Sequence, residues 1–229
     1  ESREPLPTWL AYGAPLLTVL AALVVASIPL LWIGVNPILA YDEVFLGTPS
    51  DLAGIADILT TTVPLFLAGL AVYIPLKAGL WNIGAEGQIF VGAVVGSYVG
   101  LNLGAPSYIL LPAMIVAAGA AGAVYGAIPG YLRAEHDVNE IISSLMLTFA
   151  ATTFTGYLLR GPMQGRGGQT ATNRLADAAQ FPTVLHPRLH VGVVALAVVA
   201  AFGYLLLNRT RLGYEITLIG ANPAAATQS

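Results

Sequence analysis

Residues 77–88 read Lys77-Ala-Gly-Leu-Trp-Asn-Ile-Gly-Ala-Glu-Gly-Gln88, a polar and glycine-rich stretch between two apolar runs. A plain membrane helix would carry leucine and valine here. Either a helix breaks at this point within the membrane, or the stretch is a short connecting loop at the bilayer surface with Glu86 in water. Backbone freed from a helix at membrane depth must be satisfied by protein or by a water-filled cavity, and an ionisable group there is a functional candidate.

The composition around this stretch is that of an integral membrane protein. Of the 229 residues, 56% are hydrophobic and only 9% are charged, whereas soluble domains carry about 25% charged residues. Cysteine is absent, which excludes a disulfide and a cysteine-based metal site or nucleophile. The net charge is -3 and the basic residues are scattered, so we expect no nucleic-acid partner.

Apolar runs predict an all-α, polytopic transmembrane helical bundle with about six spans in one domain over residues 1–229. The third run is only roughly 15 residues, about 22 Å at 1.5 Å per residue, and is short for a core of about 30 Å. It must borrow residues from the polar stretch or form a half-helix. The predicted spans cover residues 10–33, 58–76, 89–103, 108–132, 141–159 and 190–207.

Glycines recur at every fourth residue on the third and fourth predicted spans. Small residues at this spacing let two helix backbones approach closely, so we assign them to helix packing. They are Gly92, Gly96 and Gly100 on one span, and Gly122, Gly126 and Gly130 on the next.

The loops predict the orientation of the chain in the membrane, and one of them is long enough for a structure of its own. With the N-terminus inside, Arg3, Lys77, Arg133, Arg209 and Arg211 are cytoplasmic, although four arginines in the opposite loop at 160–188 weaken the count. That loop is long enough to contain a short helix and to face a partner.

Hydroxyls on the fifth span are expected to bond to their own helix backbone more readily than to line a pore: Ser143, Ser144, Thr148, Thr152 and Thr153.

Catalytic signatures are missing from the sequence. There is no Gly-x-x-x-x-Gly-Lys-[Ser/Thr] loop for a nucleotide and no Gly-x-Ser-x-Gly. His186 and His190 are four apart, but Pro187 between them breaks the helix that would align them on a metal. We therefore predict no catalytic residue, metal or cofactor, and translocation is the favoured activity.

Several segments resemble one family closely. The stretch Gly79-Leu-Trp-Asn-Ile-Gly-Ala-Glu-Gly-Gln88 resembles the signature of ABC importer permeases of the branched-chain amino-acid and simple-sugar group. It is most similar to the nucleoside and simple-sugar type that works with a basic-membrane-lipoprotein-like binding protein. The helix from Asp137 to Leu147 and the segment from Thr210 to Ala225, with its Gly220-Ala-Asn-Pro-Ala-Ala225, are similar too.

The resemblance implies a permease subunit that moves nucleosides or related simple sugars by alternating access. Its implied partners are an ABC ATPase, a second and different permease subunit, an extracellular solute-binding lipoprotein, and the lipid bilayer. The implied location is the cytoplasmic membrane of a bacterium or archaeon. Such permeases usually have further spans, so we expect that this chain lacks the C-terminal ones.

The family contacts its ATPase through a short cytoplasmic helix, and two segments qualify by position. Residues 214–226 come first and residues 133–140 second. The residues assigned to this coupling are Tyr214, Glu215, Gly220, Asn222, Pro223 and Ala225.

The polar stretch has two possible roles. Its residues either fix the helix break by bonding to freed backbone, which we favour, or they line the translocation path. They are Asn82, Gly84, Glu86, Gly87 and Gln88.

An ion-coupled secondary transporter or channel is the alternative function. It would need intramembrane carboxylates, for which only Glu86, Asp57 and Glu140 qualify. A purely structural membrane scaffold would fit the glycine stripes but leave the polar stretch unexplained.

Overall fold

The computed structural model describes residues 8–221 and divides the chain into two compact units, one ending at Ile58 and one beginning at Leu59. The first unit holds α1 (Thr8–Trp32), α2 (Pro37–Asp42), a π-helical turn (Glu43–Gly47), a 3-10 turn (Thr48–Ser50) and the start of α3 (Leu52–Lys77). The second holds the rest of α3, then α4 (Ala85–Asn102), α5 (Ser107–His136), α6 (Glu140–Arg160), η3 (Asp177–Ala179), β1 (Thr183–Val184), β2 (His186–His190), α7 (Gly192–Arg209) and α8 (Arg211–Ala221).

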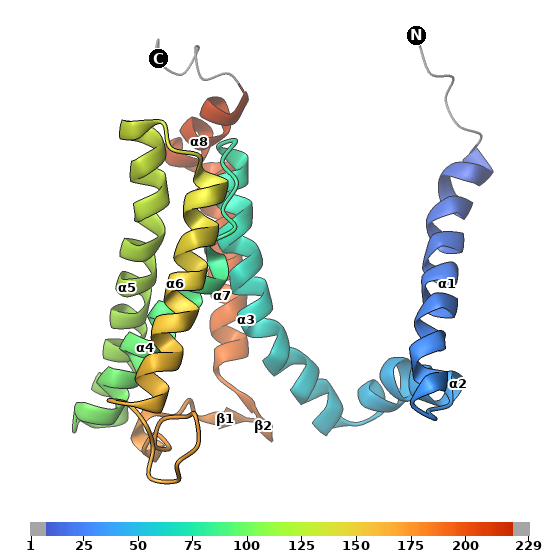
Figure 1. Cartoon of the computed structure of the whole chain (residues 1–229), viewed down its shortest axis with the longest axis horizontal. Coiled ribbons are helices and arrows are strands. Elements are labelled where there is room, and N and C mark those ends of the chain that lie inside the picture. Colours follow the sequence, from blue (N-terminus) through green and yellow to red (C-terminus); the bar gives the residue numbers. More distant parts are fainter. Residues whose placement is uncertain (1–7, 222–229) are drawn as a thin grey trace. The chain divides into compact units, whose positions relative to one another are not determined.

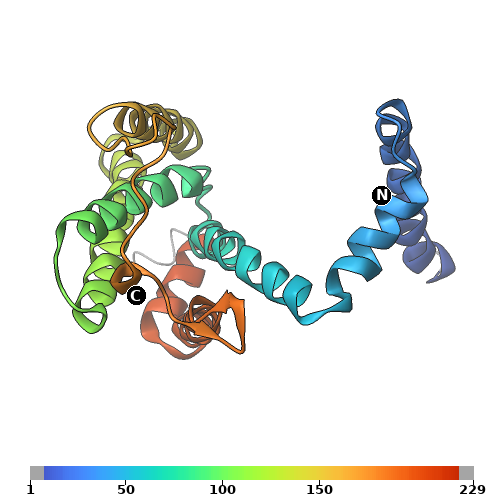
Figure 2. The same cartoon turned by 90° about the horizontal axis from the view of Figure 1, so that it is seen from below.

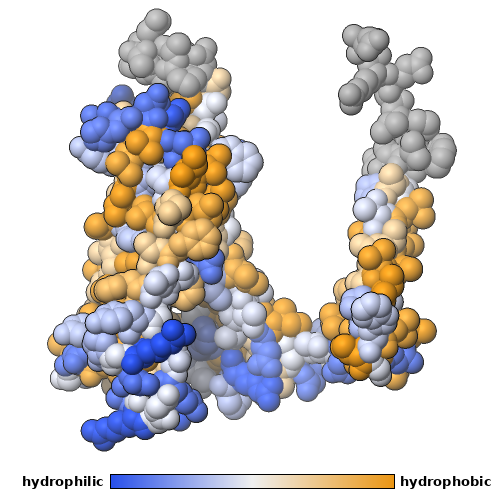
Figure 3. Space-filling view, viewed as in Figure 1, coloured by the Kyte–Doolittle hydropathy of each residue, from blue (hydrophilic) through white to orange (hydrophobic). Residues whose placement is uncertain are grey.

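The predicted all-α polytopic architecture is confirmed. Five helices of the described chain are long and apolar enough to cross a membrane: α1, α3, α5, α6 and α7. Figure 3 shows hydrophobic residues over the middle of the second unit and hydrophilic ones near its two ends. Large apolar side chains of the second unit such as Phe149 and Phe154 are exposed, as expected of a protein whose helices face lipid.

Helix α4 differs from the other expected spans. It begins at Ala85 and so takes four residues from the polar stretch, which is one of the two possibilities that the short apolar run left open. Its 18 residues cover about 27 Å. In Figure 1, α4 begins part-way along the second unit and runs obliquely toward its lower end, and Figure 2 shows it nearly side-on.

Small residues hold the second unit together. On α6 the buried positions recur every three or four residues, which places them on one face of the helix. Close approach of backbones through small residues replaces the large hydrophobic core of a soluble protein. The buried residues of α6 are Ser144, Thr148, Ala151 and Thr155.

The segment between α6 and α7 departs from the all-helical prediction. The expected short helix is present as η3, but a small antiparallel hairpin, β1 with β2, follows it. His190 was expected to begin the last span, yet it lies on β2, and α7 begins at Gly192. Pro187 within β2 has no N–H to donate, which restricts it to an edge or irregular strand.

Candidate functional site

The polar stretch folds back into the second unit after α3 ends. Its non-helical part, residues 78–84, is called the folded-back segment. Gly79 has φ +78, and its N–H bonds the carbonyl of Leu76 at 3.0 Å, while the N–H of Leu80 bonds the carbonyl of Pro75 at 3.0 Å. This is the pattern of a Schellman cap, which needs a residue in the left-handed conformation and therefore favours glycine. The chain then runs down alongside α3 before α4 starts (Figure 1).

Asn82 is the centre of the hydrogen-bond network in this segment. Its Nδ2 donates to the carbonyl of Ala71 on α3 at 2.9 Å. Its Oδ1 accepts from the N–H of Gly84 at 3.0 Å and from Nε2 of Gln88 at 3.2 Å. Ala71 precedes Lys77 by roughly 9 Å of helix, so Asn82 lies inside the bundle. It satisfies the carbonyl of Ala71, which lacks a helical donor because Pro75 has no N–H. It also satisfies the N–H of Gly84, just before α4 begins.

Helix α6 covers the other side of the segment. The N–H of Ile83 donates to Oγ of Ser144 at 3.3 Å. A Cβ on Gly84 would lie 3.1 Å from the Cβ of Ser144, and one on Gly87 would lie 2.9 Å from the Cα of Thr148. These two glycines therefore allow α4 to start directly against α6.

The structure thus brings together four of the five residues predicted in the polar stretch. Glu86 is the exception, because its side chain is exposed in the first turn of α4. A carboxylate there is favourably placed for the helix dipole. Within residues 8–221 it makes no hydrogen bond or ion pair.

The two rows of regularly spaced glycines, one on α4 and one on α5, contact different residues. Gly92 and Gly96 lie against Ala118 of α5, and a Cβ on Gly100 would lie 2.7 Å from the Cε of Met114. Gly122 and Gly126 lie against Gln88, the first against its carbonyl and the second against its side chain. Gly130 has no atom within 4 Å of where a Cβ would stand, and it lines a pocket instead.

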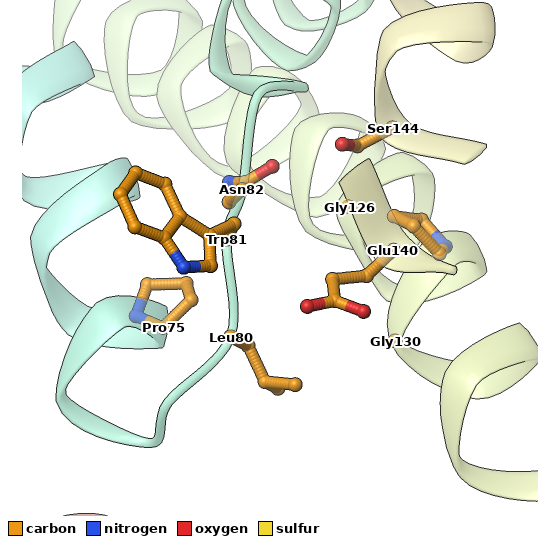
Figure 4. A pocket seen from close by; sticks show the side chains of 9 residues that line it. Pro75, Leu80, Trp81, Asn82, Gly126, Gly130, Glu140 and Ser144 are labelled. Carbon is orange, nitrogen blue, oxygen red and sulfur yellow. The ribbon is translucent and has the colours of Figure 1, made fainter. Parts of the chain in front are cut away.

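That pocket, of about 120 Å³, lies between the folded-back segment, α5 and α6. Figure 4 shows Trp81 and Asn82 on one side and Glu140 and Ser144 on the other. Its full lining is Pro75, Leu80, Trp81, Asn82, Gly126, Pro129, Gly130, Glu140 and Ser144.

A larger and more apolar groove of about 610 Å³ adjoins the pocket. It shares Pro75, Asn82 and Gly126 with the pocket, and α3, α5 and α7 supply most of its wall. The sequence did not single out either cavity, because Trp81 and Glu140 are 59 positions apart (140 − 81) and no spacing links them.

Helix α8 contacts the beginning of the folded-back segment, at Gly79. A Cβ on Gly220 would overlap the carbonyl oxygen of Lys77, and the position for one on Gly79 lies 3.6 Å from the Cα of Gly220. Of the other predicted coupling residues, Tyr214 is exposed and Glu215 pairs with Arg211 at 3.0 Å. Asn222, Pro223 and Ala225 lie outside the described residues.

Four of the five hydroxyls named on α6 bond to their own helix, as predicted, and Thr153 makes no hydrogen bond within the described residues. Thr148 and Thr152 donate to carbonyls four residues earlier at 3.1 and 3.0 Å, and Ser143 and Ser144 to carbonyls three residues earlier at 3.4 and 3.3 Å. Among residues 8–221 no group of three or more histidine, aspartate or glutamate side chains could hold a metal.

Comparison with known proteins places this architecture in a family. Residues 54–229 match the family described as "Branched-chain amino acid transport system / permease component". The chain therefore belongs to this permease family and is a multi-pass membrane protein. No solved structure matches it.

Three curated relatives illustrate the range of the family. Over its whole length the chain is 46% identical to the "Glucose ABC transporter permease protein TsgB13" of Haloferax volcanii, of which it covers 63%. Over 93% of its length it is 28% identical to the "Guanosine ABC transporter permease protein NupP" of Bacillus subtilis, covering 62% of that protein. Over 80% it is 25% identical to the "Fructose import permease protein FruG" of Bifidobacterium longum, covering 54%. The chain thus spans about three fifths of the length of the first two relatives.

Proposed function

We propose that the chain is part of a permease subunit of an ATP-driven ABC importer that carries sugars or nucleosides across the cytoplasmic membrane by alternating access. The observation that carries the proposal is the folded-back segment, which brings Asn82 and Trp81 to a pocket inside a membrane-spanning bundle. A non-helical segment at this depth suits a cavity that a polar solute enters. The named relatives include both sugar and nucleoside permeases.

The ATPase partner is assigned to the end of the second unit where α8 lies (Figure 1). Helix α8 contacts Lys77 through Gly220, and the chain continues from there into the wall of the pocket. A movement of α8 driven by a bound ATPase would therefore reach the pocket through a backbone contact, without a long side chain between them. ATP hydrolysis itself belongs to that partner.

Two further partners complete the proposed transporter. A second, different permease subunit would form the other half of the pathway, and an extracellular solute-binding lipoprotein would deliver the solute to the opposite end. The N-terminus is then cytoplasmic, together with Lys77, Arg133 and Arg209.

The ion-coupled alternative receives less support from the carboxylates. Glu86 and Asp57 are exposed on the chain, and Glu140 lies 3.6 Å from Arg133. An ion-driven carrier needs a carboxylate that binds and releases the ion at membrane depth. Glu140 instead lies at the first residue of α6, beside a fixed cation.

Solute-stimulated ATP hydrolysis tests the proposal. The full-length subunit, its neighbouring permease, the ATPase and the binding protein would be reconstituted in lipid vesicles and supplied with glucose, fructose, guanosine and leucine in turn. We expect stimulation by a sugar or a nucleoside. Stimulation by leucine alone would move the substrate to the amino acids, and an intact complex without an ATPase would reject the proposal.

A further inference from the structure

The pocket between Trp81 and Glu140 holds a carboxylate that has an ion pair but no hydrogen bond within the described chain. The Glu140 side chain is only 18% exposed, and its one charged neighbour among the described residues is Nε of Arg133, at 3.6 Å from Oε2. Within the described chain, neither carboxylate oxygen accepts a closer hydrogen bond. The carboxylate is therefore ion-paired with Arg133 but accepts no hydrogen bond within the described chain. Mostly buried polar groups are normally hydrogen-bonded, so its oxygens can still accept hydrogen bonds from a ligand.

The other groups of the pocket complement that carboxylate. Trp81, a residue that is 56% exposed, brings an indole ring. The Asn82 amide and the Ser144 hydroxyl also line the pocket, where they donate to the carbonyls of Ala71 and Ile141. In Figure 4 the Glu140 carboxylate faces the segment that carries Leu80 and Trp81. The indole offers an apolar face and one N–H donor.

From this arrangement we infer that the pocket binds the vicinal diol of a solute. A carboxylate has two acceptor oxygens and can take a hydrogen bond from each of two adjacent hydroxyls. The apolar C–H face of the ring that carries the hydroxyls then lies against Trp81. A hexose and the ribose of a nucleoside share this diol, so one pocket serves either solute class.

The size of the pocket sets how much of the solute it takes. Its volume is about 120 Å³, well below the roughly 300–1,000 Å³ of sites that enclose a drug-sized ligand. It therefore receives one sugar ring, and the rest of a larger solute lies toward the adjoining groove that shares Asn82 and Pro75. Partial enclosure gives weak binding, which suits a step on a pathway. This inference rests on the proposed function.

Cysteine protection tests the inference directly, because the sequence contains no cysteine. In the complete transporter, Leu80→Cys puts a thiol in the pocket wall, and the readout is its rate of labelling by a maleimide. We expect glucose or guanosine to slow the labelling and 2′,3′-dideoxyguanosine, which lacks the diol, to leave it unchanged. Whichever of glucose and guanosine slows the labelling shows whether the diol belongs to a sugar or to a nucleoside. Gly130→Cys, where a side chain has open space, is the second variant if Leu80→Cys does not assemble.

Matched variants separate the carboxylate from its ion pair. In the Leu80→Cys background, Glu140→Gln should raise the half-protecting concentration by about tenfold or more, the loss of a charge-assisted pair of hydrogen bonds. Asp137→Asn removes the other partner of Arg133, at 2.7 Å, without lining the pocket, and should leave protection unchanged. Glu135→Cys, exposed outside the pocket, should show no protection by any solute.

The outcomes distinguish this inference from the proposed function. If a solute stimulates ATP hydrolysis but protects neither thiol, the pocket is no solute site and the importer stands. Equal protection by guanosine and its dideoxy analogue would also overturn the diol assignment. Protection without any stimulated ATP hydrolysis would keep the site and reject the importer.

Discussion

Asn82 shows how a single polar residue makes a helix break tolerable within a membrane bundle. Its amide bonds three groups, the carbonyl of Ala71, the N–H of Gly84 and the side chain of Gln88. Asn82→Ala leaves these groups without a partner, and each unsatisfied group costs about 1–3 kcal/mol. We therefore expect a clear loss of thermal stability, measured on the purified complex in detergent.

The control for this variant is Asn102→Ala. Asn102 makes one exposed bond, to the carbonyl of Tyr98 at 2.7 Å, and its removal should change stability little. If Asn82→Ala melts at the temperature of Asn102→Ala, the amide does not hold the break.

At the scale of elements, α4 and α5 are held together by backbone approach. A Cβ on Gly96 would lie 3.2 Å from the Cβ of Ala118, so Gly96→Leu forces the helices apart, at a cost of about 1–3 kcal/mol for overpacking. Gly119→Leu is the matched variant, because Gly119 on α5 has open space around it. Thermal unfolding should separate the two variants, and equal stability would argue against the packing role.

The contact of α8 with the folded-back segment predicts a different phenotype. Gly220→Val places a side chain onto the carbonyl oxygen of Lys77, and backbone cannot move aside as a flexible side chain can. We expect the variant to assemble with the ATPase but to lose solute-stimulated hydrolysis. Ala221→Val, one residue on, is the comparison. Wild-type stimulation in Gly220→Val would show that this contact transmits nothing.

The helices themselves were predictable because length and hydropathy suffice to place a span. Their contacts were not. The role of Asn82 could be suspected from an amide among glycines, but its partner Ala71 lies on another helix, and no spacing in the sequence indicates that the chain turns back after Gly79. The pocket depends on Trp81, in the non-helical segment after α3, lying across from Glu140 at the start of α6. The hairpin after η3 was missed because His186-Pro187-Arg188 shows no alternation of polar and apolar residues.

At the scale of the molecule, the proposed function assigns different roles to the two ends of the second unit. Helices α5 and α7 end near α8, whereas the segment between α6 and α7 lies at the opposite end (Figure 1). We expect Glu135→Cys to be cytoplasmic and Gln169→Cys to be outside, since both side chains are exposed. A membrane-impermeant maleimide added to intact cells should label only the second. Labelling of Glu135→Cys alone would reverse the proposed orientation.

ATP-dependent uptake is the measurement that tests the central claim most directly. Vesicles holding the full-length subunit, its partner permease and the ATPase would be given the binding protein and radiolabelled glucose or guanosine on the side opposite to ATP. The importer predicts solute accumulation that requires ATP and persists when ionophores have collapsed all ion gradients. Accumulation driven by an ion gradient in the absence of ATP would contradict it and establish the ion-coupled alternative.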